Sequence, residues 1–199
     1  HNTKILESIH TASDLLLKGK IIIYPTDTLY GLGVDATNSL AIRKLNKLKN
    51  REQPYSIIVD SISMLKKYAI VDNQIEKKIK TLLPGPFTII LKQTKNNLSS
   101  LVAPNLNTVG IRIPNNKFIL NVVKQIKTPI ITTSVNNHGE DPLNEVKLIN
   151  KRYNNIDIFE DSQTTKSKGS TIVDLSQKPY RIIRQGDGQI IVWKFILEY

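Results

Sequence analysis

The chain has 199 residues, of which 40% are hydrophobic, so it can bury a core and lacks the composition of a disordered segment. Its net charge of +11 favours anionic partners such as nucleotides, RNA or acidic head groups, although a Lys-rich solvated surface gives the same number. The absence of cysteine excludes thiol catalysis, disulfides and Cys-based zinc sites, and three scattered histidines do not make a His-rich metal site. No apolar run approaches the roughly 18 residues of a membrane span. We therefore expect a cytoplasmic protein with no membrane association.

Strand-like β-branched runs alternate with helix-like periodic segments from end to end. In chain order the pattern predicts a strand at 20–24, a helix at 39–50, a strand at 55–60, helices at 61–69 and 72–83, strands at 87–92 and 108–113, a helix at 117–126, a strand at 129–133, a helix at 144–152, strands at 170–175 and 180–185, and a last apolar segment at 189–197. Asn38 or Ser39, Ser61 and Asp72 are the predicted N-caps. Segment 161–169 is the predicted mobile loop.

The connections between these segments include both hairpin lengths and crossover lengths, which argues against a purely parallel sheet. The sequence therefore predicts the α/β (α+β) class, with a single domain over 1–199 built on a twisted mixed β-sheet flanked by helices.

Segment 31–36, GLGVDA, formally matches the dinucleotide pattern G-x-G-x-x-G/A. That motif needs its first glycine directly after the strand and a helix that opens within the glycines. Here PTDTLYG separates the strand from the turn, and the helix opens only after Asn38, so we do not predict a Rossmann site. A P-loop, a G-x-S-x-G elbow and an H-E-x-x-H metal motif are also absent from the sequence.

Hydroxyl and amide side chains cluster at the ends of predicted strands. The clusters are Thr26, Asp27 and Thr28; Thr132, Thr133, Ser134 and Asn136; and Ser170 with Thr171. Turn and cap chemistry accounts for any one such cluster. Several in one domain predict a ligand site, because ligands of open α/β sheets bind beyond strand ends.

Two arginines, Arg112 and Arg184, stand inside apolar strands. Alternation places Arg112 on the opposite face from Ile111 and Ile113. An arginine in that setting needs an anionic partner or a strand edge. A protein carboxylate, a ligand carboxylate or a phosphate fits its fork equally well.

In the stretch LNKLKNREQP, residues 45–54, helical spacing separates one solvated cation from two cations at the end of the helix. Leu45 and Leu48 are predicted to face the core, which leaves Lys47 solvated. Lys49 and Arg51 fall where the helix ends, before a proline forces an extended chain. A helix C-terminus carries the negative end of the dipole, so an anion here depends on the side chains themselves.

Together these pieces resemble the YrdC/TsaC family of threonylcarbamoyl-AMP synthases, in the short, single-domain form, over about residues 21–188. The matching segments, in order, are YPTDTLYGLG (24–33), KNR (49–51), PGPFTIIL (84–91), VGIRIP (109–114), SVN (134–136), GSTIVD (169–174) and RQGDG (184–188). No single segment is specific, and the order of all of them carries the resemblance.

The resemblance implies an enzyme, a nucleotidyltransferase of the L-threonylcarbamoyladenylate synthase type. Its reaction joins L-threonine, bicarbonate and ATP into threonylcarbamoyl-AMP and pyrophosphate. The product supplies the N6-threonylcarbamoyladenosine modification of tRNA through a downstream tRNA threonylcarbamoyl transferase complex. The implied fold holds a deep basic concave cavity, and Mg²⁺ is implied to arrive with ATP.

Residue by residue, the resemblance assigns Lys49 and Arg51 to catalysis and to the ATP phosphates, completed by Ser134 and Asn136. Thr108 and Arg184 would also contact ATP. The implied threonine-binding residues are Thr28, Arg112, Thr132 and Ser170, with Thr26 an open alternative to Thr28. No resident metal ligand is implied.

The chain departs from the family pattern in three places. Val135 replaces a common alanine, and His138 stands where a serine is usual. Some relatives carry a histidine shortly after a Pro-Leu pair, and here that region reads PYSIIV.

A second hypothesis is a non-catalytic module that binds double-stranded RNA or tRNA in the same basic cavity. The net charge supports it, whereas a 6% aromatic content without an RNP-like pattern does not indicate stacking on single strands. A purely structural protein leaves the strand-embedded arginines unexplained.

Overall fold

Helices and strands alternate along the chain in the computed structural model, which describes residues 2–52, 54–161 and 166–190. The helices are α1 (Asn2–Leu17), α2 (Ser39–Lys49), α3 (Ile62–Tyr68), α4 (Asn73–Leu82), α5 (Lys117–Ile126) and α6 (Val146–Arg152). The strands are β1 (Ile22–Tyr24), β2 (Gly31–Gly33), β3 (Ser56–Ile58), β4 (Phe87–Lys92), β5 (Thr108–Arg112), β6 (Ile130–Ser134), β7 (Asp157–Ile158), β8 (Thr171–Asp174) and β9 (Arg181–Arg184).

Most predicted segments have a counterpart within a few residues, and the predicted caps are confirmed. Asn38, Ser61 and Asp72 each accept a hydrogen bond from a backbone N–H in the first turn of α2, α3 and α4. Segment 191–197 of the last apolar stretch and residues 162–165 of the predicted loop lie outside the described residues.

Three elements, α1, β2 and β7, have no counterpart among the predicted segments. α1 buries Ile9, Ala12 and Leu16 at helical spacing and packs against α5 and β1. β2 consists of Gly-Leu-Gly, which has none of the β-branched residues that mark a strand, and β7 has only 2 residues.

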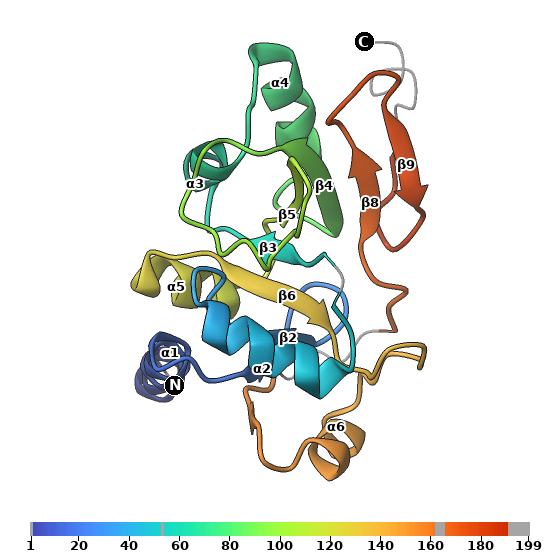
Figure 1. The fold of residues 1–199 in the computed structure, drawn as a ribbon. Helices are drawn as coiled ribbons and strands as arrows, with labels where there is room; N and C mark the ends of the chain where they lie inside the picture. The colour runs from blue at the N-terminus through green and yellow to red at the C-terminus, as the bar shows by residue number, and fades with distance from the viewer. Residues whose placement is uncertain (1, 53, 162–165, 191–199) are drawn as a thin grey trace.

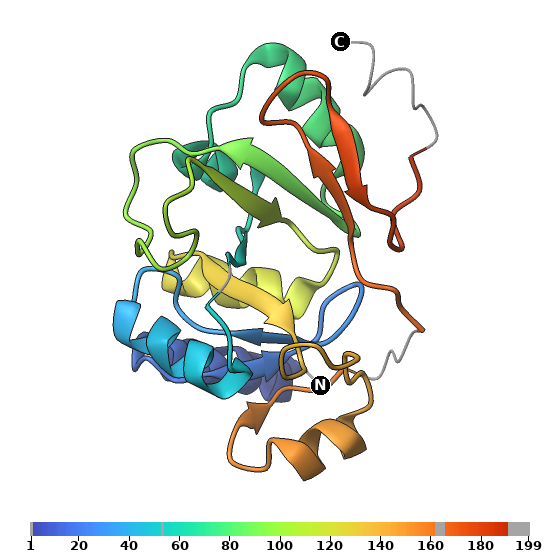
Figure 2. The ribbon, with the colours of Figure 1, turned by 45° about the vertical axis from the view of Figure 1, so that its right-hand side comes forward.

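The strands form one twisted sheet of 9 strands in the order β7-β1-β2-β6-β3-β5-β4-β8-β9 (Figures 1 and 2). Parallel pairing joins β1 to β7, β3 to β5 and β4 to β8, and every other neighbouring pair is antiparallel. The predicted single α/β domain with a mixed sheet is confirmed. None of the described helices is long and apolar enough to cross a membrane.

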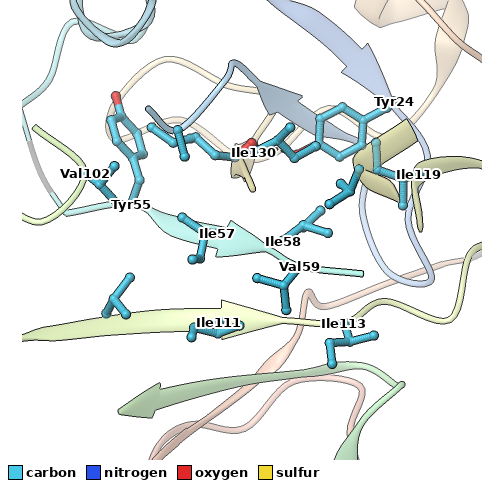
Figure 3. Close-up of a cluster of buried hydrophobic side chains, with 14 of the residues drawn as sticks. Tyr24, Tyr55, Ile57, Ile58, Val59, Val102, Ile111, Ile113, Ile119 and Ile130 are labelled. Atoms are coloured by element: carbon cyan, nitrogen blue, oxygen red, sulfur yellow. Dashed lines mark hydrogen bonds between the residues drawn. The ribbon is translucent and has the colours of Figure 1, made fainter. Parts of the chain in front are cut away.

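The register gives the central strands an apolar face and an opposite, polar face, on which hydroxyl side chains and Arg112 lie beside the buried Ile58 and Ile130. On the apolar face a row of fully buried side chains crosses the central strands, made of Ile131, Ile57, Ile111, Ile89 and Val173. Figure 3 shows Ile57 and Ile111 in this cluster, on adjacent strands, with Ile58 at the end of β3 and Val59 just after it. The isoleucine row therefore fixes which side chains the strands present on the opposite face.

The Gly-Leu-Gly sequence of β2 makes room for the ring of Tyr24 on β1. The Tyr24 hydroxyl donates to the Ile131 carbonyl at 3.0 Å, across the strand between them. A Cβ at Gly33 would lie 2.5 Å from that carbonyl and 2.6 Å from the Tyr24 ring. Only glycine fits here, which explains a segment that looks like a turn in the sequence.

Candidate active site

The polar face of the sheet is hollowed into a cavity of about 310 Å³. Its floor carries small polar side chains from neighbouring strands: Thr132 and Ser134 on β6, Ser56 on β3, Thr88 on β4, and Ser170 just before β8. Gly110 pairs with Ser56, and a Cβ there would lie 2.6 Å from the Ser56 hydroxyl oxygen. The missing side chain therefore makes room for the Ser56 hydroxyl on the floor.

Arg112 is buried in the cavity wall at the end of β5, on the opposite face from Ile111, as alternation predicts. Its Nη2 donates to Asp27 Oδ1 at 2.6 Å and its Nη1 to Thr28 Oγ1 at 3.2 Å. Burial lowers the pKa of the guanidinium, and the neighbouring Asp27 carboxylate opposes that shift. The anionic partner that the sequence leaves open is thus a protein carboxylate, while Nε stays buried without a hydrogen-bond partner.

The two candidate threonines after β1 have different environments. Thr28 is buried and lines the cavity. The Thr26 hydroxyl donates to the Leu29 carbonyl at 2.6 Å and accepts from the Thr28 backbone N–H at 3.0 Å. Thr26 therefore holds the turn, and Thr28 is the one that reaches the cavity.

Ser170 links the far side of the floor to Arg184 on β9. Its hydroxyl lies 2.7 Å from the Thr88 hydroxyl, and its carbonyl accepts from Arg184 Nη2 at 2.8 Å. Arg184 also lines the cavity, with its side chain more exposed than that of Arg112. Within the described chain, Arg184 has no carboxylate within 4.0 Å.

Arg51 enters the cavity from the end of α2. The helix ends at Asn50, a left-handed C-cap with φ 54°, and the chain turns so that Arg51 N–H donates to the Asn46 carbonyl. The guanidinium carbon lies 5.4 Å from the centre of the Tyr55 ring, and Nε is buried without a partner. No ion pair joins Arg51 to a described carboxylate, which leaves its charge available to a ligand.

Lys49 is fully buried and lies behind the cavity rather than on its surface. Its Nζ donates to the Ser134 carbonyl and, at 2.9 Å, to Asn136 Oδ1, which also accepts from the Ser134 hydroxyl at 2.7 Å. Burial, reinforced by the nearby Arg51 charge, lowers the pKa of Lys49 to about 7. Lys47 is exposed, as the helical spacing predicts.

Most of the residues predicted for the site therefore converge on one cavity. The lining contains Thr28, Arg51, Arg112, Thr132, Ser134, Ser170 and Arg184. Lys49 and Asn136 support it from behind, and Thr108 lies half-buried at the start of β5, outside the lining.

The sequence prediction missed Ser56, Thr88 and Tyr55, which also line the cavity. Pairing each strand with its neighbours would find Ser56 and Thr88, because both share a face with Arg112. Over the described residues, no group of three or more His, Asp or Glu side chains could hold a metal ion.

A family model of Sua5, YciO and YrdC proteins, described as telomere recombination, matches residues 14–186. The chain belongs to this family. A Methanocaldococcus jannaschii protein that carries the name threonylcarbamoyl-AMP synthase provisionally is 39% identical over 177 residues, covering 86% of this chain and 82% of the relative.

Solved structures of the Sua5/YciO/YrdC family share the fold. Sua5 of Pyrococcus abyssi, crystallised with L-threonine, is 27% identical with a TM-score of 0.82 over 89% of this chain. This chain spans 54% of that longer protein. Escherichia coli YciO is 26% identical with a TM-score of 0.84, covering 95% of this chain and 93% of YciO.

Proposed function

We propose that the protein is an L-threonylcarbamoyladenylate synthase, a nucleotidyltransferase that uses L-threonine, bicarbonate and ATP. The observation that carries the proposal is the convergence of Arg51, Arg112 and Arg184 with a floor of hydroxyl groups in one cavity. Such a cavity suits a substrate pair with several negative groups and a small polar amino acid. Relatives that bear the synthase name support this function, whereas none of them supports a non-catalytic RNA-binding module.

The threonine half of the site would lie around Arg112. The Nε of Arg112 is buried and unpartnered beside the cavity, so a substrate carboxylate would satisfy it. Thr28, Thr132 and Ser170 would accept from the ammonium group or bond the substrate hydroxyl. The L-threonine in the Pyrococcus abyssi complex supports this choice of amino acid.

The nucleotide half would lie around Arg51, with Ser134, Asn136, Thr108 and Arg184 as further ATP contacts. In the reaction the threonine nitrogen bonds to the bicarbonate carbon with loss of water. A carbamate oxygen then bonds to the α-phosphorus of ATP, and the bond to the β-phosphate oxygen breaks to release pyrophosphate. Because pyrophosphate leaves readily, positioning and positive charge matter more than a strong base. We assign Arg51 to this step directly, and Lys49 to holding Ser134 and Asn136 in place behind the cavity wall.

We further propose that Mg²⁺ enters bound to the ATP phosphates, where it neutralises charge on the leaving group. The carboxylate of Asp27, which contacts the cavity-lining Arg112, is already engaged by that arginine and by the Asn115 backbone N–H. We also propose that the product passes to a tRNA threonylcarbamoyl transferase complex. The last proposed partner is tRNA itself, through direct contact with this protein.

Release of pyrophosphate tests the function. Purified protein would be incubated with ATP, Mg²⁺ and bicarbonate, with and without L-threonine, and pyrophosphate measured by a coupled assay. We expect release that depends on both threonine and bicarbonate, and a product with the mass of threonylcarbamoyl-AMP. Release that does not respond to threonine would rule out the synthase.

A further inference from the structure

Tyr55 lies directly against Arg51 in the cavity wall, and the proposed reaction gives it no role. The Arg51 guanidinium carbon is 5.4 Å from the centre of the Tyr55 ring, within the range of a cation–π contact. Tyr55 is 3% exposed, and both residues line the cavity. The ring therefore forms a fixed surface beneath a charged group that faces open space.

The ring itself is held from two sides. The Tyr55 hydroxyl donates to Asn46 Oδ1 at 2.6 Å, and the Tyr55 N–H donates to the Val102 carbonyl at 2.8 Å. The Asn46 carbonyl also accepts from the Arg51 N–H at 3.1 Å. The end of α2, the ring and the Arg51 backbone are thus tied together through Asn46.

Arg51 has few other restraints on its side chain. Its Nε is buried without a hydrogen-bond partner, and no described carboxylate pairs with it. A long side chain loses considerable rotamer freedom when it is fixed to bind a ligand. A ring already in contact with the guanidinium removes part of that loss before the ligand arrives.

We propose that Tyr55 is a positioning residue that holds the Arg51 guanidinium at the cavity for a polyphosphate group and so sets the affinity for nucleotide. The inference rests on the proposed function, in which Arg51 binds the phosphates of ATP. It predicts an effect of Tyr55 that is transmitted through Arg51 alone.

The test measures binding of inorganic triphosphate by calorimetry to the wild-type protein, Tyr55→Leu and Tyr55→Phe. Tyr55→Leu removes the ring, so we expect about tenfold weaker binding. Tyr55→Phe keeps the ring face and loses the bond to Asn46, so we expect a loss of about two- to threefold. In turnover, Tyr55→Leu should raise the KM for ATP and leave the KM for threonine unaltered.

A double-mutant cycle separates positioning from general damage. In the Arg51→Ala background the change Tyr55→Leu should weaken triphosphate binding no further. An equal loss with and without Arg51 would overturn the proposal. If Tyr55→Leu does not fold, Tyr55→Phe and Asn46→Ala enter the same cycle, because neither truncates the buried ring.

Tyr68 provides the matched control. It is 6% exposed, its hydroxyl donates to Asn97 Oδ1 at 3.0 Å, and it does not line the cavity. Tyr68→Leu should lower the melting temperature about as much as Tyr55→Leu and leave triphosphate binding unchanged.

Triphosphate binding needs neither threonine nor turnover, so the two proposals fail separately. A wild-type protein that binds triphosphate through Arg51 but releases no pyrophosphate would contradict the synthase and keep the role of Tyr55. A wild-type protein that releases pyrophosphate in response to threonine but binds no triphosphate through Arg51 would overturn the role of Tyr55 and keep the synthase.

Discussion

Lys49 and Arg51 are separated by one residue, yet the structure gives them different environments. Arg51 reaches the cavity and has no acidic partner among the described residues, whereas Lys49 is fully buried against Ser134 and Asn136. The left-handed Asn50 between them ends the helix and sends the two side chains in different directions. Charge supplied to the cavity and support for its wall are thus divided between two residues of one short motif.

Removing the charge of Arg51 should impair turnover without unfolding the protein. We expect Arg51→Ala to lower kcat/KM for ATP by about 10²- to 10³-fold, the usual effect of removing one donor to a charged transition state. Lys47→Ala is the matched control, since Lys47 is an exposed cation from the same helix end. Steady-state pyrophosphate release measures both, and a normal rate for Arg51→Ala would contradict the phosphate role.

The low pKa of Lys49 should make stability depend on pH. With a folded pKa of about 7 against an ordinary value of 10.5, the unfolded chain binds a proton that the folded protein does not bind across that interval. The free energy of unfolding should therefore rise as the pH increases from 7 to 9. Lys49→Met should remove this rise and Lys47→Met should keep it, as measured by urea unfolding at each pH.

At the scale of elements, local signals in the sequence located most helices and strands. Asn38, Ser61 and Asp72 marked helix starts because capping is a contact within a few residues. β2 was missed because its glycines are explained by the Tyr24 ring, which packs against the strand from β1 and leaves no room for side chains there. The helix α1 was not predicted, although Ile9, Ala12 and Leu16 recur at helical spacing and are buried.

The predicted site shows the same contrast between local signals, which the sequence carries, and contacts between distant segments, which it does not. Strand alternation gave the face of Arg112, but its partner Asp27 lies 85 residues away and depends on the assembled sheet. The KNR segment, residues 49–51, does not indicate whether Lys49 or Arg51 faces the cavity. Thr28 and Thr26 likewise differ only in three dimensions, through the turn that Thr26 holds.

The close packing at β2 predicts a strong effect of a single methyl group. In Gly33→Ala the added Cβ would meet the Ile131 carbonyl at 2.5 Å, so the strand has to shift. We expect a loss of about 3 kcal/mol in the free energy of unfolding, as for other overpacked cores.

Gly139→Ala is the control for that substitution in chemical denaturation. It meets nothing within 4 Å but has a φ of +83°, so it should cost only about 1 kcal/mol of backbone strain. A Gly33→Ala protein as stable as the control would contradict the packing described for β2.

At the scale of the whole molecule, the cavity draws residues from both halves of the sheet. Thr28 and Ser134 come from the end that contains β1, β2 and β6, and Ser170 and Arg184 come from the end that contains β8 and β9. A ligand that contacts both sets would tie distant parts of the sheet together.

L-Threonine should therefore stabilise the whole fold. At about 100 times its dissociation constant it should add about 2.7 kcal/mol, or roughly 5–10 °C in melting temperature. L-Valine has the same shape with a methyl group in place of the hydroxyl, and should give a much smaller shift at equal concentration. Equal shifts in a thermal unfolding assay would contradict a site that bonds the threonine hydroxyl.

Because of the alternating register of the central strands, a correctly formed cavity and a correctly formed core depend on each other in any protein sample. Ile131 precedes Thr132, Ser56 precedes Ile57 and Thr88 precedes Ile89, so a core side chain and a cavity side chain are always neighbours in sequence. A slip of one residue would expose the isoleucines and bury the hydroxyl groups together. Inactive material should accordingly be unfolded or aggregated, and the fraction of competent sites should equal the fraction of folded protein.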